Sequence, residues 1–233
     1  MVMKPLDPEI LNLARTRRGP YLAAISAPGA QRADLLALLA LDAELSRIAS
    51  AVSEHMLGRI RLQWWQDALA DGSATHPALV ALAPLNVDAQ GLSALVEAYT
   101  FTLEVTPATV PDHVAFATAS GGTLAALLVD ALGVEDHEAC AAARDVGTAW
   151  ALTETLSSGR RVASNEDAAA LRAHALALLG QARARSIAKA HRRKALPVLL
   201  LARLAMRCLN NPHDPLGAGA VLSVWWGGVV ARF

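Results

Sequence analysis

Apolar residues recur at helical spacing along most of the chain, and no segment alternates apolar and polar residues as a half-buried strand does. Residues 88–103 show the spacing clearly, with Leu92, Leu95 and Val96 on one side of the expected helix. Residues 31–52 are apolar almost throughout, which is typical of a helix that is buried on most of its surface. The pattern therefore predicts an all-α protein with a buried central helix.

Glycine, proline and polar residues divide this pattern into roughly nine or ten helices. We expect Arg18-Gly19-Pro20 to end the first helix, Asp112 to cap the helix that follows Pro111, and Gly133 to end that helix. The expected helices span residues 8–17, 21–26, 31–52, 56–69, 77–82, 88–103, 112–132, 139–156, 167–190 and 197–209, with a glycine-weakened stretch at 216–230. The length of 233 residues suits a single helical domain, residues 1–233.

Composition supports the same fold class. Alanine and leucine, both strong helix formers, account for 50 and 37 residues, and aromatic residues make up only 4% of the chain, which is low for a sandwich or barrel. An apolar content of 54% with no net charge excludes a disordered chain. Cys140 and Cys208 are the only cysteines, so we expect buried free thiols, a reducing compartment and no disulfide framework.

The sequence shows no segment that we expect to cross a membrane. The first residues lack the apolar run of a signal peptide. The uncharged stretches at 114–129 and 215–231 are shorter than the roughly 20 residues of a spanning helix, and both contain glycines. We therefore expect a cytoplasmic protein, with peripheral contact to the inner membrane as a further option.

The neutral total charge hides an asymmetry. Residues 1–167 carry 11 basic and 20 acidic side chains, whereas residues 168–213 carry 9 basic and none acidic. The densest basic cluster supplies candidate contacts to anions or to a membrane surface: Arg185, Lys189, Arg192 and Arg193. The alternative is that this cluster faces the acidic half of the chain or ends a solvated helix. No aromatic residues interleave with it, so nucleic acid is not an expected partner.

The common catalytic motifs for phosphate, dinucleotide and zinc chemistry are absent. Asp67 and Asp71 share one helical face, a spacing that helical enzymes use to hold magnesium on a diphosphate. However, Asp71 precedes a glycine, so we expect both at a solvated helix end. Asp42 and Glu44 lie two residues apart and therefore on different faces of the central helix. We expect no metal site.

Three dipeptides carry weaker signals. Gly121-Gly122 lies inside an expected helix, which indicates a close approach of a neighbouring backbone. Trp64-Trp65 is expected to anchor helix packing. Trp225-Trp226 could lie at a membrane interface, in the core or on a partner surface.

Segments of the N-terminal half resemble a known family. Residues 21–69 include Leu-Asp-Ala-Glu-Leu-Ser-Arg-Ile and Arg-Leu-Gln-Trp-Trp-Gln-Asp-Ala-Leu. They resemble the squalene/phytoene synthase family, most closely its complex I assembly factor 6-like branch of alphaproteobacterial type. Residues 117–124 and 147–156 are similar to two further helices of that family. The resemblance implies an isoprenoid-synthase-like helical bundle and, in catalytic members, two aspartate-rich motifs that hold magnesium on a diphosphate.

The sequence departs from the family pattern at both motifs. The first aspartate-rich motif falls on Ser46-Arg47-Ile48-Ala49-Ser50. In the second motif, the family's glutamine and asparagine fall on Ala151 and Glu154, and an Arg-Asp pair of the family falls on Ser157-Ser158. The tyrosine-containing segment that follows in the family is missing, so the chain looks shortened there. Since these carboxylates hold the catalytic metal, the resemblance implies a non-catalytic member.

Three functions stay open at this point. The first is a scaffold or assembly factor, with respiratory complex I subunits as partners. The second is a prenyl transferase whose magnesium site has moved to Asp42, Glu44 or Asp67, the one case in which a cofactor is expected. The third is a carrier of an isoprenoid lipid. By their match to the family pattern, four residues are candidates to line the cavity: Glu44, Arg61, Gln63 and Trp65. Arg61 could instead pair with Glu44 or Glu54.

Overall fold

The computed structural model describes residues 7–51, 55–72, 75–104, 107–158 and 162–211, together with residues 220, 222, 224, 226 and 227. Every regular element within these ranges is helical, as the apolar pattern predicts. The elements are α1 (Pro8–Thr16), α2 (Arg18–Ala24), α3 (Gly29–Ala51), α4 (His55–Ala70), α5 (Pro77–Leu82), α6 (Ala89–Glu104), α7 (Val110–Ala117), the π-helix η1 (Thr118–Gly122), α8 (Thr123–Ala131), α9 (His137–Ser158), α10 (Asn165–Ala184), α11 (Lys189–Leu199) and α12 (Leu201–Asn210).

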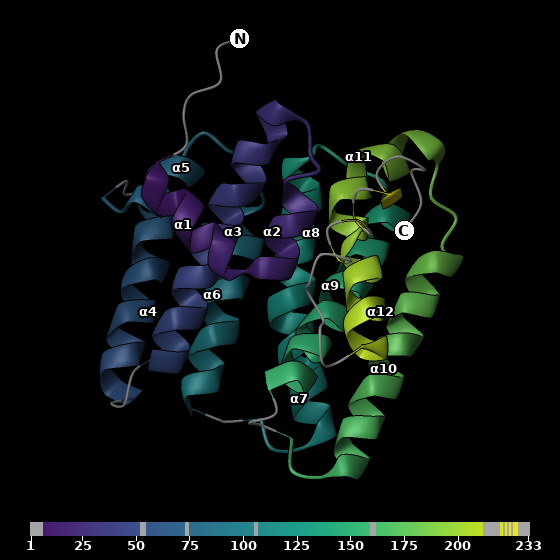
Figure 1. Cartoon of the computed structure of the whole chain (residues 1–233). Coiled ribbons are helices and arrows are strands. Elements are labelled where there is room, and N and C mark those ends of the chain that lie inside the picture. The colour runs from purple at the N-terminus through teal and green to yellow at the C-terminus, as the bar shows by residue number, and fades with distance from the viewer. Residues whose placement is uncertain are drawn as a thin grey trace.

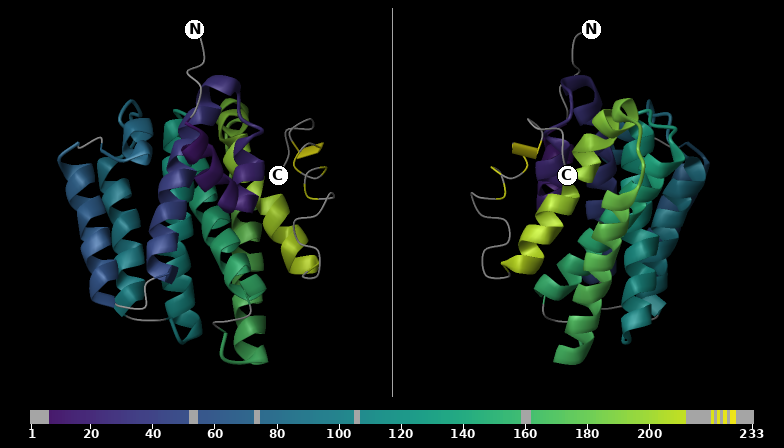
Figure 2. Two further views of the ribbon diagram at one scale, coloured as in Figure 1. Left: turned by 60° about the vertical axis from the view of Figure 1, so that its left-hand side comes forward. Right: turned by 90° about the vertical axis from the view of Figure 1, so that its right-hand side faces the viewer.

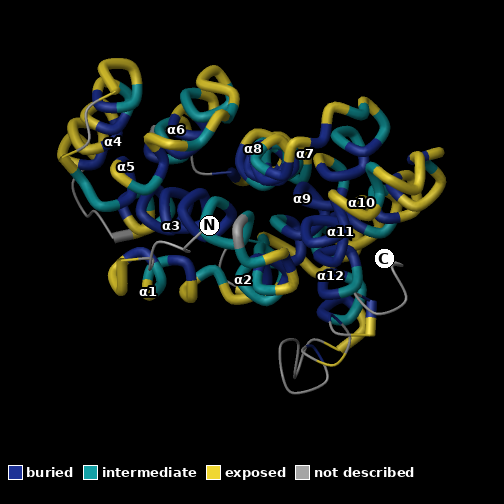
Figure 3. The backbone as a smooth tube through the Cα atoms, turned by 90° about the horizontal axis from the view of Figure 1, so that it is seen from above, coloured by how far each residue is buried: buried dark blue, intermediate teal, exposed yellow. Residues whose placement is uncertain are grey.

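Two long helices, α3 and α9, form the interior of the bundle (Figures 1 and 3). The expected central helix is α3, whose side chains Leu38, Leu39, Leu41 and Leu45 are completely buried. Helix α9 packs against α7, η1, α8, α10, α11 and α12. It can approach so many neighbours because small residues occupy much of its surface, including the buried Ala142, Ala143 and Gly147 among others.

Two pairs of helices form the outer edges of the bundle. Helices α4 and α6 pack together at one edge, and α10 and α12 lie toward the other (Figure 2). On α4, Trp65 is buried and meets Trp64 and His76 edge to face, so this member of the tryptophan pair anchors helix packing as predicted. Trp64 itself is 43% exposed.

The helix starts show two differences from the sequence prediction. The first helix ends at Thr16, next to its expected end, but Gly19 and Pro20 form no interruption: they lie in the first turn of α2, where proline fits without the loss of a hydrogen bond. Asp112 is not the cap of α7. The cap is Thr109, whose hydroxyl accepts from the Asp112 backbone while the Asp112 carboxylate accepts from the Thr109 backbone, which completes a capping box.

The expected long helix over residues 167–190 is wrong. Helix α10 ends at Ala184, and α11 begins at Lys189 after a non-helical connection. Residues there are good helix formers, so the break comes from packing: Ile187 is buried and turns the chain back onto the bundle. Pro197 lies inside α11 rather than at a helix start, three residues before the interruption at Leu200. The expected stretch at 216–230 falls mostly outside the described residues.

The Gly121-Gly122 dipeptide lies in η1 and faces α9. A Cβ added to Gly147 would lie 2.2 Å from the Gly121 carbonyl oxygen, and one added to Gly121 would lie 2.5 Å from the Gly147 carbonyl oxygen. This confirms the predicted close approach of a neighbouring backbone. Among the described residues, one helical stretch, Val110–Ala131, is long and apolar enough to cross a membrane by length and composition, and half of its most apolar window is buried inside the bundle.

Both cysteines are free thiols, as expected. Cys208 is buried and Cys140 is half-buried. Burial raises the pKa of Cys208 to about 11, so its thiol stays protonated at neutral pH. The pair therefore behaves as small apolar residues of the packed interior.

Candidate functional site

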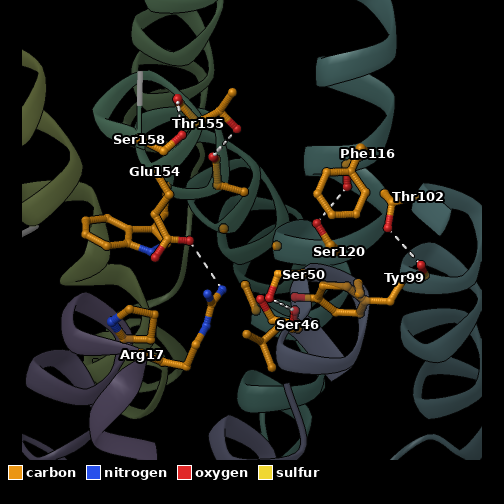
Figure 4. Close-up of a pocket in the computed structure, with 18 of the residues that line it drawn as sticks. Arg17, Ser46, Ser50, Tyr99, Thr102, Phe116, Ser120, Glu154, Thr155 and Ser158 are labelled. Carbon is orange, nitrogen blue, oxygen red and sulfur yellow. Dashed lines mark hydrogen bonds and ion pairs between the residues drawn. The ribbon is translucent and has the colours of Figure 1, made fainter. Parts of the chain in front are cut away.

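A cavity of about 420 Å³ opens among α2, α3, α4, α6, α7, η1, α8, α9 and α12, with Arg17 from the junction of α1 and α2 (Figure 4). Its polar lining comes from Arg17, Ser46, Ser50, His55, Tyr99, Thr102, Ser120, Glu154, Thr155 and Ser158. Its apolar lining includes Leu103, Phe116, Leu124, Leu128, Trp150 and Leu201. The size lies within the usual range of small-molecule sites, and we call this cavity the central pocket.

Arg17, from the C-terminal end of α1, joins two carboxylates at the central pocket. Its Nε lies 2.5 Å from Asp42 Oδ2, and its Nη2 lies 3.2 Å from Glu154 Oε2. The Tyr99 hydroxyl donates to Asp42 Oδ1 over 2.6 Å. Asp42 is 1% exposed on α3, so this carboxylate needs both partners to offset the loss of water. Four helices, α1, α3, α6 and α9, are thus linked through one polar network.

The network shifts the pKa values of its members. Burial raises the pKa of Tyr99 well above its usual value, and the Asp42 charge adds to the rise, so the phenol is neutral. Burial also raises the pKa of Glu154; Arg17 opposes this rise and Asp42 reinforces it. Burial works to lower the pKa of Arg17, but Asp42 and Glu154 outweigh it and raise that pKa. Arg17 is therefore a permanent cation between two carboxyl groups.

The positions of both family motifs face the central pocket. Ser46 and Ser50 of α3 line it from one side, and Ala151, Glu154 and Ser158 of α9 line it from the other. These helices present their residues in the arrangement that the resemblance implies for two opposed motifs. The residues placed there are hydroxyls, a methyl group and one ion-paired carboxylate.

This donor set does not fit magnesium. Mg²⁺ is held by carboxylate oxygens, water and substrate phosphates in octahedral geometry. Glu154 is the carboxylate that faces the pocket from the second motif, and Arg17 already binds it. Within the described ranges, no group of three or more His, Cys, Asp or Glu side chains is placed to hold a metal ion.

The four cavity candidates from the sequence lie outside the central pocket. Glu44, Arg61 and Trp65 meet at a separate hollow of about 440 Å³ between α3 and α4. Gln63 lines an open groove between α4 and α6. Glu44 forms an ion pair with Arg47, whose Nη2 lies 2.6 Å from Glu44 Oε2. A ligand-binding role for these four residues stays a prediction.

The acidic pairs lie as expected. Asp42 and Glu44 point to different sides of α3, one toward Arg17 and the other toward Arg47. Asp67 and Asp71 are exposed at the end of α4, where Asp67 accepts a hydrogen bond from Gln63. Neither pair therefore forms a two-carboxylate clamp.

Part of the basic cluster is ion-paired to acidic residues, and part of it is exposed to solvent. Arg185 lies 2.9 Å from Asp145 and 3.3 Å from Glu138, so at this residue the basic region does face the acidic half of the chain. Lys189 and Arg193 are exposed on α11, and Arg192 is half-buried. Of the tryptophan dipeptide near the C-terminus, Trp226 is 56% exposed and Trp225 lies outside the described residues.

Sequence reasoning missed Arg17 and Tyr99. Arg17 stands among three basic residues at a helix end, a setting typical of solvated charge, and Tyr99 fits an apolar helix face. The usable signal was Asp42, because a carboxylate inside the apolar run of α3 needs a cation or hydrogen-bond donors from elsewhere in the chain.

Comparisons with known proteins agree with this architecture. Residues 13–168 match the family model described as squalene/phytoene synthase. A crystal structure of a dehydrosqualene synthase in complex with a ligand matches with a TM-score of 0.68 and 12% identity, and the match covers 95% of each chain. No curated protein matches the chain in sequence. The family match spans more than half of the chain and the structural match shows the fold, so the chain belongs to the squalene/phytoene synthase family and has its helical isoprenoid synthase fold.

Proposed function

We propose that this chain is a non-catalytic member of its family, a scaffold or assembly factor that keeps the helical bundle and has lost the metal chemistry. One observation carries the proposal. Where the family's metal-binding carboxylates are expected, the central pocket presents Ser46, Ser50 and Ser158, and the carboxylate at the family's asparagine position, Glu154, is ion-paired to Arg17.

The physical argument concerns the leaving group. Ionisation of an allylic diphosphate places negative charge on the departing oxygens, and catalytic members stabilise it with magnesium. A hydroxyl in place of a carboxylate binds Mg²⁺ far more weakly, because the attraction of a full charge is gone. Loss of even one such stabilising group slows a reaction by about 10²–10³-fold, and here several positions have changed together.

Diphosphate release tests the proposal. The purified protein is incubated with farnesyl or geranylgeranyl diphosphate and magnesium, with a chelator as the control and an active squalene/phytoene synthase as the positive reference. We expect no release above the chelator background. Magnesium-dependent release would refute the proposal and favour the prenyl transferase alternative, with Asp42 as the first carboxylate to replace because it pairs with Arg17, which lines the central pocket.

For the assembly role, we propose respiratory complex I as the target, on the resemblance of residues 21–69 alone. We expect the tagged protein to co-purify with complex I subunits and its loss to lower complex I levels. Unchanged complex I after gene deletion would refute this part. A cytoplasmic protein that contacts the inner membrane through the exposed Lys189 and Arg193 fits the role, and flotation with anionic vesicles tests that contact.

A second candidate, a carrier of prenyl lipid, is favoured by the central pocket itself. The cavity persists although the motif carboxylates do not, and leucine, phenylalanine and tryptophan side chains form much of its wall. A carrier needs apolar enclosure and no metal, so binding of a prenyl lipid should be unaffected by a chelator. Chelator-sensitive binding would contradict this candidate.

A further inference from the structure

Most of the hydroxyl groups around the central pocket have already used their protons. Five of them donate to carbonyl oxygens of their own helices (Figure 4): Ser50 to Ser46 at 2.8 Å, Thr102 to Tyr99 at 2.8 Å, Ser120 to Phe116 at 2.7 Å, Thr155 to Ala151 at 3.1 Å and Ser158 to Thr155 at 2.8 Å. A carbonyl can only accept, so in each bond the hydroxyl is the donor. Each hydroxyl oxygen therefore presents lone pairs, and no proton, to a ligand.

The tyrosine and the charged groups of the network are likewise engaged with one another. Tyr99 gives its proton to Asp42, and Arg17 forms ion pairs through Nε with Asp42 and through Nη2 with Glu154. Near neutral pH the network combines one cation with two carboxyl groups, and the neutral phenol adds no charge. Besides Arg17, the other titratable donor of the described lining is His55, which is exposed at the N-terminal end of α4.

The rest of the lining is mostly apolar. Leu103, Phe116, Leu124 and Leu128 come from α6, α7 and α8, and Leu201 comes from α12. The pocket thus joins an apolar enclosure to a rim of hydrogen-bond acceptors. A phosphate head group brings only acceptors and negative charge, which Glu154 would repel. The N–H donors of the described lining are Arg17, already ion-paired to two carboxyl groups, His55 and the Trp150 indole. An ammonium or hydroxyl group brings the donors that the rim lacks.

We propose that the central pocket binds an apolar chain whose head group donates hydrogen bonds, an ammonium or a hydroxyl, in preference to the same chain with a phosphate head. This rests on the proposed non-catalytic function, because a bound metal would reverse the preference. Glu154 is the main selecting residue, since among the described lining residues it supplies the carboxylate; Arg17 contacts its Oε2, so a cationic head would share this carboxylate with Arg17.

Three ligands that share one chain test the preference. Farnesylamine, farnesol and farnesyl monophosphate are titrated by calorimetry in a metal-free buffer at neutral pH, below their aggregation concentrations. We expect farnesylamine to bind tightest, farnesol next, and the monophosphate at least about tenfold more weakly than the amine. A monophosphate that binds as tightly as the amine overturns the proposal, as does a failure of all three to bind.

Two variants assign the effect to the pocket. Glu154→Gln keeps the shape and removes the charge, so it should weaken farnesylamine by about tenfold and change farnesol by less than about threefold. Asp67→Asn removes an exposed carboxylate of the α4–α6 groove and should change neither. Thermal unfolding checks that both variants fold. Equal amine affinity in the wild type and Glu154→Gln overturns the role of Glu154.

The outcomes separate this inference from the proposed function. Magnesium-dependent diphosphate release refutes the non-catalytic function whatever the head-group order. Absence of release together with tighter binding of the monophosphate refutes only the acceptor-lined pocket.

Discussion

The contact between Gly121 and Gly147 gives the sharpest test of the packing. In Gly147→Ala, the new methyl carbon would lie 2.2 Å from the Gly121 carbonyl oxygen and 2.5 Å from Ala125 Cβ. Two carbon atoms in good contact are about 3.5–4.0 Å apart, so α9 must move from η1 and α8 by roughly 1 Å. Backbone atoms form one side of the clash, and no flexible side chain can turn away to relieve it.

The expected change in the free energy of unfolding of Gly147→Ala is the difference between two opposed effects. Insertion of a methyl group into a packed core costs about 1–3 kcal/mol, and the rigid surroundings place this site near the upper value. Alanine is better than glycine inside a helix by about 1 kcal/mol. The expected net loss is therefore about 2 kcal/mol, which corresponds to a fall in Tm of about 4–8 °C for a chain of this size.

A matched control comes from α10. Gly180 is exposed in the middle of this helix, and a Cβ added there meets no atom within 4 Å. Gly180→Ala should therefore show the helix gain alone, a stabilisation of about 1 kcal/mol. Urea unfolding followed by circular dichroism measures both variants. If Gly147→Ala is as stable as Gly180→Ala, the two helices are not in backbone contact and the reasoning is refuted.

Three further predictions concern the polar network and the tryptophans. The folded state raises the pKa of Glu154, so ionisation of this carboxyl group destabilises the fold. In urea titrations, the stability of the wild type relative to Glu154→Gln should therefore fall as pH rises above about 4.5. A stability difference that does not depend on pH would contradict the raised pKa. Tyr99→Phe removes a buried donor from Asp42 and should cost about 1–3 kcal/mol by urea unfolding, whereas an unchanged midpoint would show that Asp42 does not need it. Trp65→Ala should cost about 3–5 kcal/mol and Trp64→Ala about 1 kcal/mol, and equal losses in thermal unfolding would contradict their different burial.

The fold was largely predictable because burial in a helical bundle leaves a periodic trace. The apolar run of α3 predicted that this helix is buried, and the glycine pair of η1 predicted the close approach of a neighbouring backbone. The connection at 185–188 was not predictable, because its residues suit a helix and only the docking of Ile187 ends it. Local sequence holds little information on a break that tertiary contacts impose.

The candidate site was predictable in outline only. The resemblance aligned Ser46, Ser50 and Glu154 with the two motifs, and these residues do surround the pocket. Arg17 escaped notice because its partner Glu154 lies 137 positions away, and no periodic pattern relates the two. Pairings of this kind depend on how whole helices meet, which composition and spacing do not encode.

The π-helix η1 sets the rotation of α8 about the helix axis relative to α7. A π-turn holds one more residue than an α-turn, so α8 emerges from η1 rotated relative to a straight continuation of α7. One residue corresponds to about 100° of rotation, so an ordinary α-helical path through the same residues 118–122 would swing Leu124 and Leu128 away from the interior by roughly that angle. The wider turn of η1 thus absorbs one residue locally, and α8 keeps both leucines in the core.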